Sequence, residues 1–328
     1  MVAAGVLQGS FMVPMKFTRR WAWENTWLGF ASTAYLLWPW LLALATLPHL
    51  PAVFAATSLH CLVLVELLGL GWGLGAVTFG LGVDKLGMGL GFTIILGLAA
   101  SAGTLIPLVV LFPEKLLRPQ GLLTMTSLLL VLGGIGCCSW AGREREQNQN
   151  AGHENRGSSF VTGLLICIIS GVLSSFGNLA FAFGGEVTQR AIQNGAAESM
   201  AGNSLWALLT IPLFLINAIY SLWLLKKRGT GRRFFEKGTA HYWFLAAAMG
   251  LLWIAGFVFY APGARALGPL GPSVGWSIML SAMVITANLA GFFTGEWKGA
   301  SRKARFLLLA GIGILLGAIC VIGYANQV

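Results

Sequence analysis

Long apolar stretches alternate with short polar connections along the whole chain. A helix that crosses ~30 Å of hydrocarbon needs ~20 mostly apolar residues. Ten stretches fit this pattern, and they predict an all-α polytopic membrane protein with ten transmembrane helices. The stretches are Val2–Phe17, Trp27–Leu47, Cys61–Gly82, Leu86–Phe112, Gly121–Ala141, Phe160–Gly184, Ser204–Leu225, His241–Pro262, Ser273–Thr294 and Arg305–Ala325.

Composition agrees with lipid as the main solvent. Of the 328 residues, 56% are hydrophobic and only 10% are charged, and the mean hydropathy is +0.77. A soluble protein of this length needs a far larger polar surface. The 44 glycines lie inside apolar runs, where they let helix backbones approach closely, as membrane helices do.

The basic residues predict the orientation of the chain. Most of the 21 Lys and Arg lie in the connections after the first, third, fifth, seventh and ninth stretches. The positive-inside rule places these connections in the cytoplasm, so both termini should face outward. The net charge of +10 is therefore interpreted as topological, and not as a nucleic-acid surface. The N-terminus lacks the basic region and cleavage site of a signal peptide.

No pattern in the sequence indicates enzyme chemistry, a cofactor or a metal. None of the five cysteines has metal-ligand spacing with a histidine, so packing is expected for all of them, without a disulfide framework. Nucleophile elbows and phosphate loops are also missing from the sequence. The cysteines are Cys61, Cys137, Cys138, Cys167 and Cys320.

The ten stretches divide into two sets of five, and the second set partly repeats the first. Trp72, Phe79 and Gly82 recur at one constant offset as Trp253, Tyr260 and Gly263, and Gly5-Val6-Leu7 is echoed by Gly171-Val172-Leu173. Because five is odd, the second half must enter the membrane from the opposite side, which predicts an inverted repeat. The expected units are residues 1–142, a cytoplasmic linker at 143–158, and residues 159–328.

Several motifs, in a preserved order, resemble the L-rhamnose–proton symporter family of the drug/metabolite transporter superfamily. They are Gly9-Ser10-Phe11, Pro14-Met15-Lys16, Trp21-Ala22-Trp23-Glu24-Asn25-Thr26-Trp27, Trp72-Gly73-Leu74-Gly75, Leu86-Gly87-Met88, Gly103-Thr104-Leu105, Trp253 with Phe259-Tyr260-Ala261, and Glu296-Trp297. The resemblance implies two inverted five-helix halves in a bacterial inner membrane. It also implies import of a monosaccharide such as L-rhamnose with a proton, through a cavity lined by spans one, three, four, six, eight and nine.

A sugar site needs aromatic faces beside polar side chains that bond hydroxyl groups, and in a transporter it should lie near the midplane. At ~1.5 Å per residue, Trp72 and Trp253 each lie about 17 Å into their spans. Membrane Trp residues usually gather at the interfaces, so this central pair is a candidate sugar platform, with helix packing as the alternative. The other predicted substrate-binding residues are Gln8, Ser174, Asn178, Tyr260, Trp276 and Ser277. Asn288 is among the polar residues for which packing is expected.

Three carboxylates are candidates for proton coupling. A charge at membrane depth costs ~2.5–3.5 kcal/mol on insertion scales, so an acid within a span suggests function. Glu66 lies inside the third stretch and is the first candidate, followed by Glu24 and Glu296 at the cytoplasmic ends of the second and ninth stretches. Lys16 is expected to anchor the chain at the cytoplasmic surface, or to pair with Glu24 or Glu296 in an inner gate.

Two other functions stay open at this point. One is an exporter of amino acids or other small metabolites, as elsewhere in the superfamily, and the other is a sodium-coupled or uncoupled sugar porter. The sequence does not specify the sugar, the coupling ion or the oligomeric state. The expected partners are a sugar, a proton and the lipid bilayer.

Overall fold

The computed structural model describes residues 1–86, 88–149 and 160–325, and all regular structure in these residues is helical. The elements are α1 (Val2–Ser10), η1 (Val13–Phe17), α2 (Trp23–Ala31), η2 (Ser32–Leu37), α3 (Trp38–Thr46), α4 (Leu50–Ala56), α5 (Leu59–Leu86), α6 (Met88–Leu111), η3 (Pro113–Lys115), α7 (Pro119–Gln149), α8 (Phe160–Ser174), α9 (Phe176–Phe183), α10 (Gly185–Gln193), α11 (Gly202–Arg228), η4 (Thr230–Phe235), α12 (His241–Ala266), η5 (Gly268–Leu270), α13 (Gly271–Phe293) and α14 (Arg302–Ala325).

Nine helical segments of the described chain are long and apolar enough to cross a membrane. They correspond to the second through tenth predicted stretches, so the prediction of an all-α membrane protein is confirmed. Three of the nine are composite: α2, η2 and α3 form one, α8, α9 and α10 form another, and η5 and α13 form the third. The predicted linker at 143–158 begins inside α7, and its residues 150–158 lie outside the described residues.

The first predicted span differs from the structure. Val2–Phe17 forms α1, which has nine residues, followed by the 3-10 helix η1. At 1.5 Å per residue α1 is about 14 Å long, less than half of the hydrocarbon thickness. Pro14 lies in the first turn of η1, and its missing N–H and fixed φ favour a new turn over continuation of α1.

The sixth span is interrupted in the middle. Between α8 and α9, the backbone N–H and the hydroxyl of Ser175 both donate to the carbonyl of Val172, at 3.1 and 2.7 Å. The interruption sits three residues before Asn178, which is fully buried. Irregular backbone at membrane depth occurs where it is buried in protein or lines a cavity. The interruption is therefore a candidate for a functional role.

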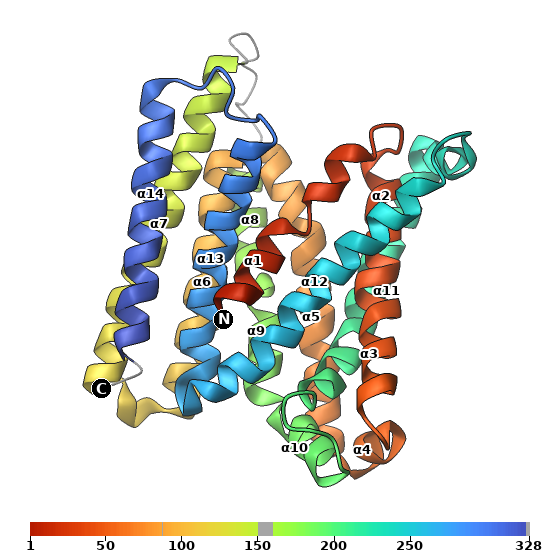
Figure 1. Ribbon diagram of the computed structural model, residues 1–328, viewed down its shortest axis with the longest axis vertical. Coiled ribbons are helices and arrows are strands. Elements are labelled where there is room, and N and C mark those ends of the chain that lie inside the picture. Colours follow the sequence, from red (N-terminus) through yellow and green to blue (C-terminus); the bar gives the residue numbers. More distant parts are fainter. Residues whose placement is uncertain (87, 150–159, 326–328) are drawn as a thin grey trace.

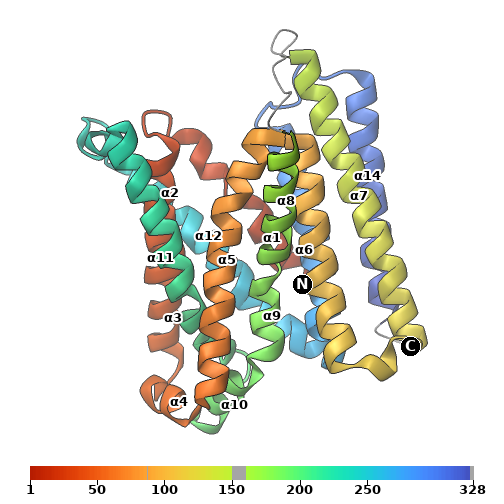
Figure 2. The same cartoon turned by 180° about the vertical axis from the view of Figure 1, so that it is seen from behind.

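The helices form a layered bundle whose order is the same in both views (Figures 1 and 2). The pair α7 and α14 lies at one side, followed by α6 and α13, then by α1 with α8, and then by α5 and α12. The helices α2, α3 and α11 close the other side. The short helix α1 packs against both α12 and α13, and α8 packs against both α5 and α6.

Basic residues concentrate at one end of the bundle, the upper end in Figure 1. We call it the basic end. It holds the α13–α14 connection, the α11–α12 connection with Arg232 and Arg233, and the last turn of α11 with Lys226, Lys227 and Arg228. The opposite end holds α4, α10 and the connections α6–α7 and α12–α13 (Figure 1).

Candidate functional site

The two predicted central tryptophans contact each other. Trp72 of α5 and Trp253 of α12 have ring centroids 5.6 Å apart, with an angle of 33° between the planes. Trp253 is buried and Trp72 is half-buried. Gln8 of α1 donates from Nε2 to the Trp253 carbonyl at 2.8 Å. Three helices thus meet here, where two tryptophan rings are in contact and an amide binds the backbone of one of them.

Asn178 and Tyr260 form the centre of a buried polar network. The Tyr260 hydroxyl donates to Asn178 Oδ1 at 2.5 Å. Asn178 Nδ2 donates to the Gly103 carbonyl at 2.7 Å and to the Pro272 carbonyl at 3.0 Å. The network therefore joins α9, α12 and α6 with the first turn of α13, and it uses both N–H donors and one acceptor position of the Asn178 amide.

Trp276 and Ser277 fasten α13 to α6 next to this network. Trp276 Nε1 donates to the Ala99 carbonyl at 3.0 Å, and the hydroxyls of Ser277 and Thr104 lie 2.8 Å apart. Both predicted residues are almost fully buried. The structure thus brings Asn178, Tyr260, Trp276 and Ser277 together at the interface of α6 and α13.

Ser174 lies apart from this network. It is the half-buried last residue of α8. Its backbone nitrogen is so close to Gly75 of α5 that a Cβ at Gly75 would come within 2.9 Å. No hydrogen bond of the Ser174 hydroxyl occurs among the described residues. Its position supports close packing of α5 on α8, and its hydroxyl is available for another contact.

A cavity of about 210 Å³ lies between α6, α7 and α13 toward the basic end. Its apolar walls come from Phe92, Leu96, Ile135, Cys138, Met283, Val284 and Ala287. Its polar lining consists of Ser139, Arg145, Asn288 and Glu296, beside Gly142 and Trp297. Sequence reasoning missed this cavity, because Arg145 belongs to a basic connection and Asn288 was expected to pack.

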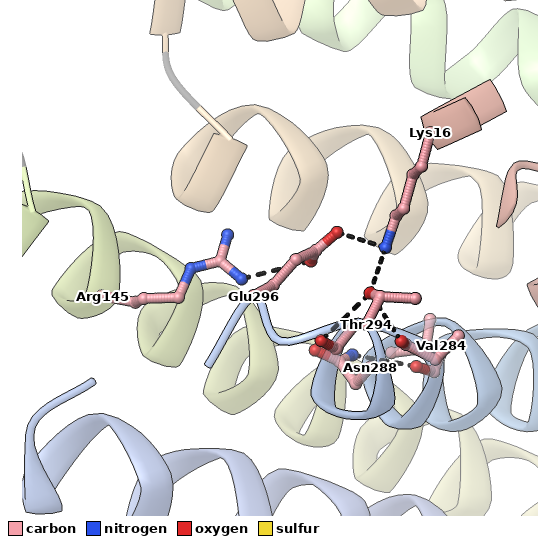
Figure 3. A network of polar contacts seen from close by, with 8 residues as sticks. Lys16, Arg145, Val284, Asn288, Thr294 and Glu296 are labelled. Atoms are coloured by element: carbon pink, nitrogen blue, oxygen red, sulfur yellow. Dashed lines mark hydrogen bonds and ion pairs between the residues drawn. The ribbon is translucent and has the colours of Figure 1, made fainter. Parts of the chain in front are cut away.

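An ion cluster that includes Arg145 and Glu296 lies at the basic end of the cavity (Figure 3). Glu296 Oε1 forms an ion pair with Lys16 of η1. Glu296 Oε2 forms a second ion pair with the guanidinium of Arg145 of α7, at 3.4 Å. Lys16 also donates to the Thr294 hydroxyl at 2.6 Å. The Arg145 guanidinium lies over the Trp297 ring, 5.0 Å from its centroid. The cluster joins the segment after α1, the end of α7 and the α13–α14 connection.

The other two candidate carboxylates lie elsewhere. Glu24 is completely buried in the first turn of α2, where it pairs with Arg228 at 3.0 Å and accepts from the Thr230 hydroxyl at 2.7 Å. Glu66 is half-buried on α5, and in the described part of the chain it has no ion pair or hydrogen bond. No group of three or more His, Cys, Asp or Glu within the described residues could hold a metal ion.

The long apolar helices, the interrupted sixth span and the buried polar side chains define a polytopic membrane protein built to enclose polar groups within a helical bundle. Residues 1–222 match the family model described as L-rhamnose-proton symport protein (RhaT). The chain belongs to this family, whose members are transporters and not enzymes.

Three relatives named L-rhamnose-proton symporter are each 25% identical to the chain. They come from Shigella boydii serotype 18 (strain CDC 3083-94 / BS512), Citrobacter koseri (strain ATCC BAA-895 / CDC 4225-83 / SGSC4696) and Escherichia coli (strain 55989 / EAEC). Each match covers 95% of this chain and 92% of the relative.

Proposed function

We propose that this protein is a secondary transporter of the inner membrane that imports a monosaccharide, L-rhamnose or a related sugar, together with a proton by alternating access. Family membership and the names of the relatives support the sugar and the proton. The observation that carries the proposal is the contact of Trp72 and Trp253 beside Gln8. It supplies aromatic rings for sugar C–H groups near the amide of Gln8.

The proposed architecture is ten membrane segments in two inverted halves, with α1 as a short first segment. Helix contacts between the halves support it, because a close contact of a first-half helix on the second half has a counterpart of a second-half helix on the first. Gly5 of α1 lies against Met279 and Ala282 of α13, and Gly171 of α8 lies against Ile95 and Leu98 of α6.

The same correspondence holds between α5 and α12. Gly75 of α5 lies against Leu173 and Ser174, and Gly256 of α12 lies against Ala4 and Gln8. The predicted equivalents Trp72 and Trp253 are on these two helices and contact each other. We propose residues 1–142 and 159–328 as the two halves, which would meet at this pair.

We propose that the basic end faces the cytoplasm and that both termini face outward. The positive-inside rule supports this orientation, because the Lys- and Arg-rich connections lie together at one end (Figure 1). The ion cluster of Lys16, Glu296 and Arg145 would then lie at the inner gate. The network of Asn178 and Tyr260 would lie toward the outside.

Glu66 is the proposed coupling group. A coupling carboxylate must gain and lose a proton in each cycle and be exposed in turn to each side. Glu66 is inside a span and has no described partner, whereas Glu24 and Glu296 hold ion pairs that would have to break first. One charge moved across the membrane supplies ~2.3 kcal/mol per 100 mV, and tenfold accumulation of sugar needs ~1.4 kcal/mol.

Sugar uptake by reconstituted protein tests the proposal. Proteoliposomes should accumulate L-rhamnose when an inward proton gradient is imposed, and a protonophore should abolish the accumulation. Accumulation driven only by a sodium gradient would show that sodium, and not a proton, is the coupling ion. Downhill uptake alone would mean an uncoupled porter. Absence of any monosaccharide uptake, with efflux of amino acids, would favour the exporter.

A further inference from the structure

The interface between α6 and α13 changes character along its length. Near the opposite end it is closed by hydrogen bonds between Trp276 and the Ala99 carbonyl and between Ser277 and Thr104. Toward the basic end the same two helices separate around the 210 Å³ cavity, with α7 as the third wall. The cavity therefore continues the interface that the predicted substrate residues close.

The cavity is lined by polar groups that have unused hydrogen-bonding positions. Asn288 donates from Nδ2 to the Val284 carbonyl of its own helix at 2.9 Å, and its Oδ1 accepts no hydrogen bond from the described residues. The Ser139 hydroxyl also has none there. Arg145 is 8% exposed, and its one hydrogen bond within the described chain uses NH1, to Glu296. Asn288 and Ser139 are half-buried, and together with the buried Arg145 they favour a ligand that supplies both donors and acceptors.

The charges indicate the chemical class of that ligand. Arg145 and Glu296 line the same end of the cavity, so a net anion would meet the carboxylate and a net cation would meet the guanidinium. A neutral polyol can accept from Arg145 and donate to Glu296, Asn288 and Ser139. The apolar walls, including the ring of Phe92, suit the C–H faces of a sugar.

The size agrees with a single small molecule. The cavity has a volume of about 210 Å³. It is smaller than the ~300 Å³ at which sites for drug-sized ligands begin. A monosaccharide is smaller than a drug-sized ligand.

We propose that the cavity between α6, α7 and α13 is a second monosaccharide site, occupied on the cytoplasmic side before the sugar is released. This inference rests on the proposed function. Asn288 and Ser139 bind sugar hydroxyls there, and Arg145 binds them through the nitrogens that Glu296 does not use. Since Glu296 also holds Lys16, sugar in this site contacts the ion cluster at the inner gate.

Transport from each side of the membrane tests the site. Asn288→Leu and Ser139→Ala are compared with wild type in inside-out and right-side-out vesicles, with radiolabelled L-rhamnose. Loss of one hydrogen bond should raise the half-saturating concentration at the cytoplasmic face about three- to tenfold. The value at the outer face should stay within about twofold.

Asn194→Leu is the matched control. Asn194 also donates from Nδ2 to the carbonyl four residues earlier, that of Arg190 at 2.8 Å, but it lies at the end of α10, away from the cavity. It should leave both half-saturating concentrations unchanged. Melting temperatures of the detergent-purified variants identify any variant that folds poorly. If Asn288→Leu folds poorly, the test rests on Ser139→Ala.

Protection of Cys138 gives an independent measurement, because Cys138 lines the cavity. In protein whose four other cysteines are replaced by Ser, L-rhamnose should slow alkylation of Cys138 by a membrane-permeant maleimide. Unprotected Cys138, or variants that match wild type at the cytoplasmic face, would overturn the second site while wild-type transport stands. Wild-type vesicles that carry no sugar from either side would instead refute the proposed function.

Discussion

Removal of one hydroxyl, in Tyr260→Phe, tests the network that joins α6, α9, α12 and α13. The Tyr260 hydroxyl lies 2.5 Å from Asn178 Oδ1 and 3.2 Å from the Pro272 carbonyl. A hydroxyl has one proton to donate, so the shorter contact is the hydrogen bond. Asn178 and Tyr260 are both 0% exposed, and Asn178 Oδ1 has no other donor within the described residues.

The magnitude follows from this geometry. A buried acceptor left without its donor costs ~1–3 kcal/mol, so Tyr260→Phe should destabilise the closed arrangement by about 2 kcal/mol. If opening to the outside breaks the network, as the proposed orientation requires, the ratio of open to closed protein should rise. At ~1.4 kcal/mol per factor of ten, the rise is about thirtyfold.

Labelling of a cysteine beside the network measures the ratio. Thr104→Cys is introduced into both the wild-type and the Tyr260→Phe background, so that loss of the bond between Thr104 and Ser277 is common to both. An impermeant maleimide added outside intact cells should label the Tyr260→Phe protein about thirtyfold faster.

Tyr35→Phe is the matched control for this experiment. Tyr35 is 3% exposed and its ring packs on Trp253, but its hydroxyl makes no hydrogen bond with the described chain. Its removal should leave the labelling rate unchanged. Equal labelling rates in Tyr260→Phe and Tyr35→Phe would refute the gating role of the network and leave Asn178 and Tyr260 as packing residues.

Three further predictions follow from other parts of the structure. Trp72→Ala and Trp253→Ala should each weaken L-rhamnose binding at least tenfold in a thermal-shift titration of folded protein, and unchanged affinity in both would move the sugar site elsewhere. Glu66→Gln should keep exchange of sugar between equal pools and lose uphill uptake under a pH gradient, whereas retained uphill uptake would eliminate Glu66 as coupling group. Glu24→Gln should lower the free energy of unfolding by ~1–3 kcal/mol, measured by denaturation in detergent, because it removes the charge that Arg228 pairs with; a stability equal to wild type would show that this pair contributes nothing.

The sequence by itself determined the helices and much of their arrangement. In lipid every backbone polar group must be satisfied within the protein, so an apolar stretch of sufficient length has to be helical. For this reason nine of the ten predicted stretches appear as spanning helices in the described chain. The length of α1 was not determined in this way, because α1 ends at Ser10 and Pro14 begins a separate 3-10 turn within a stretch that is mostly apolar.

The tertiary structure decided which side chains meet. The spacing of Trp72 and Trp253 placed both at the same depth, but their contact depends on how closely α5 and α12 approach. Asn178 bonds to Tyr260 in a span whose helix is interrupted just before Asn178, and no local sequence pattern specifies Tyr260 as its partner. Arg145 resembled any basic residue of a connection until α7 and the α13–α14 connection placed it over Trp297 and beside Glu296. Lipid fixes helix length through local hydropathy, whereas contacts between helices depend on small residues and polar groups far apart in the chain.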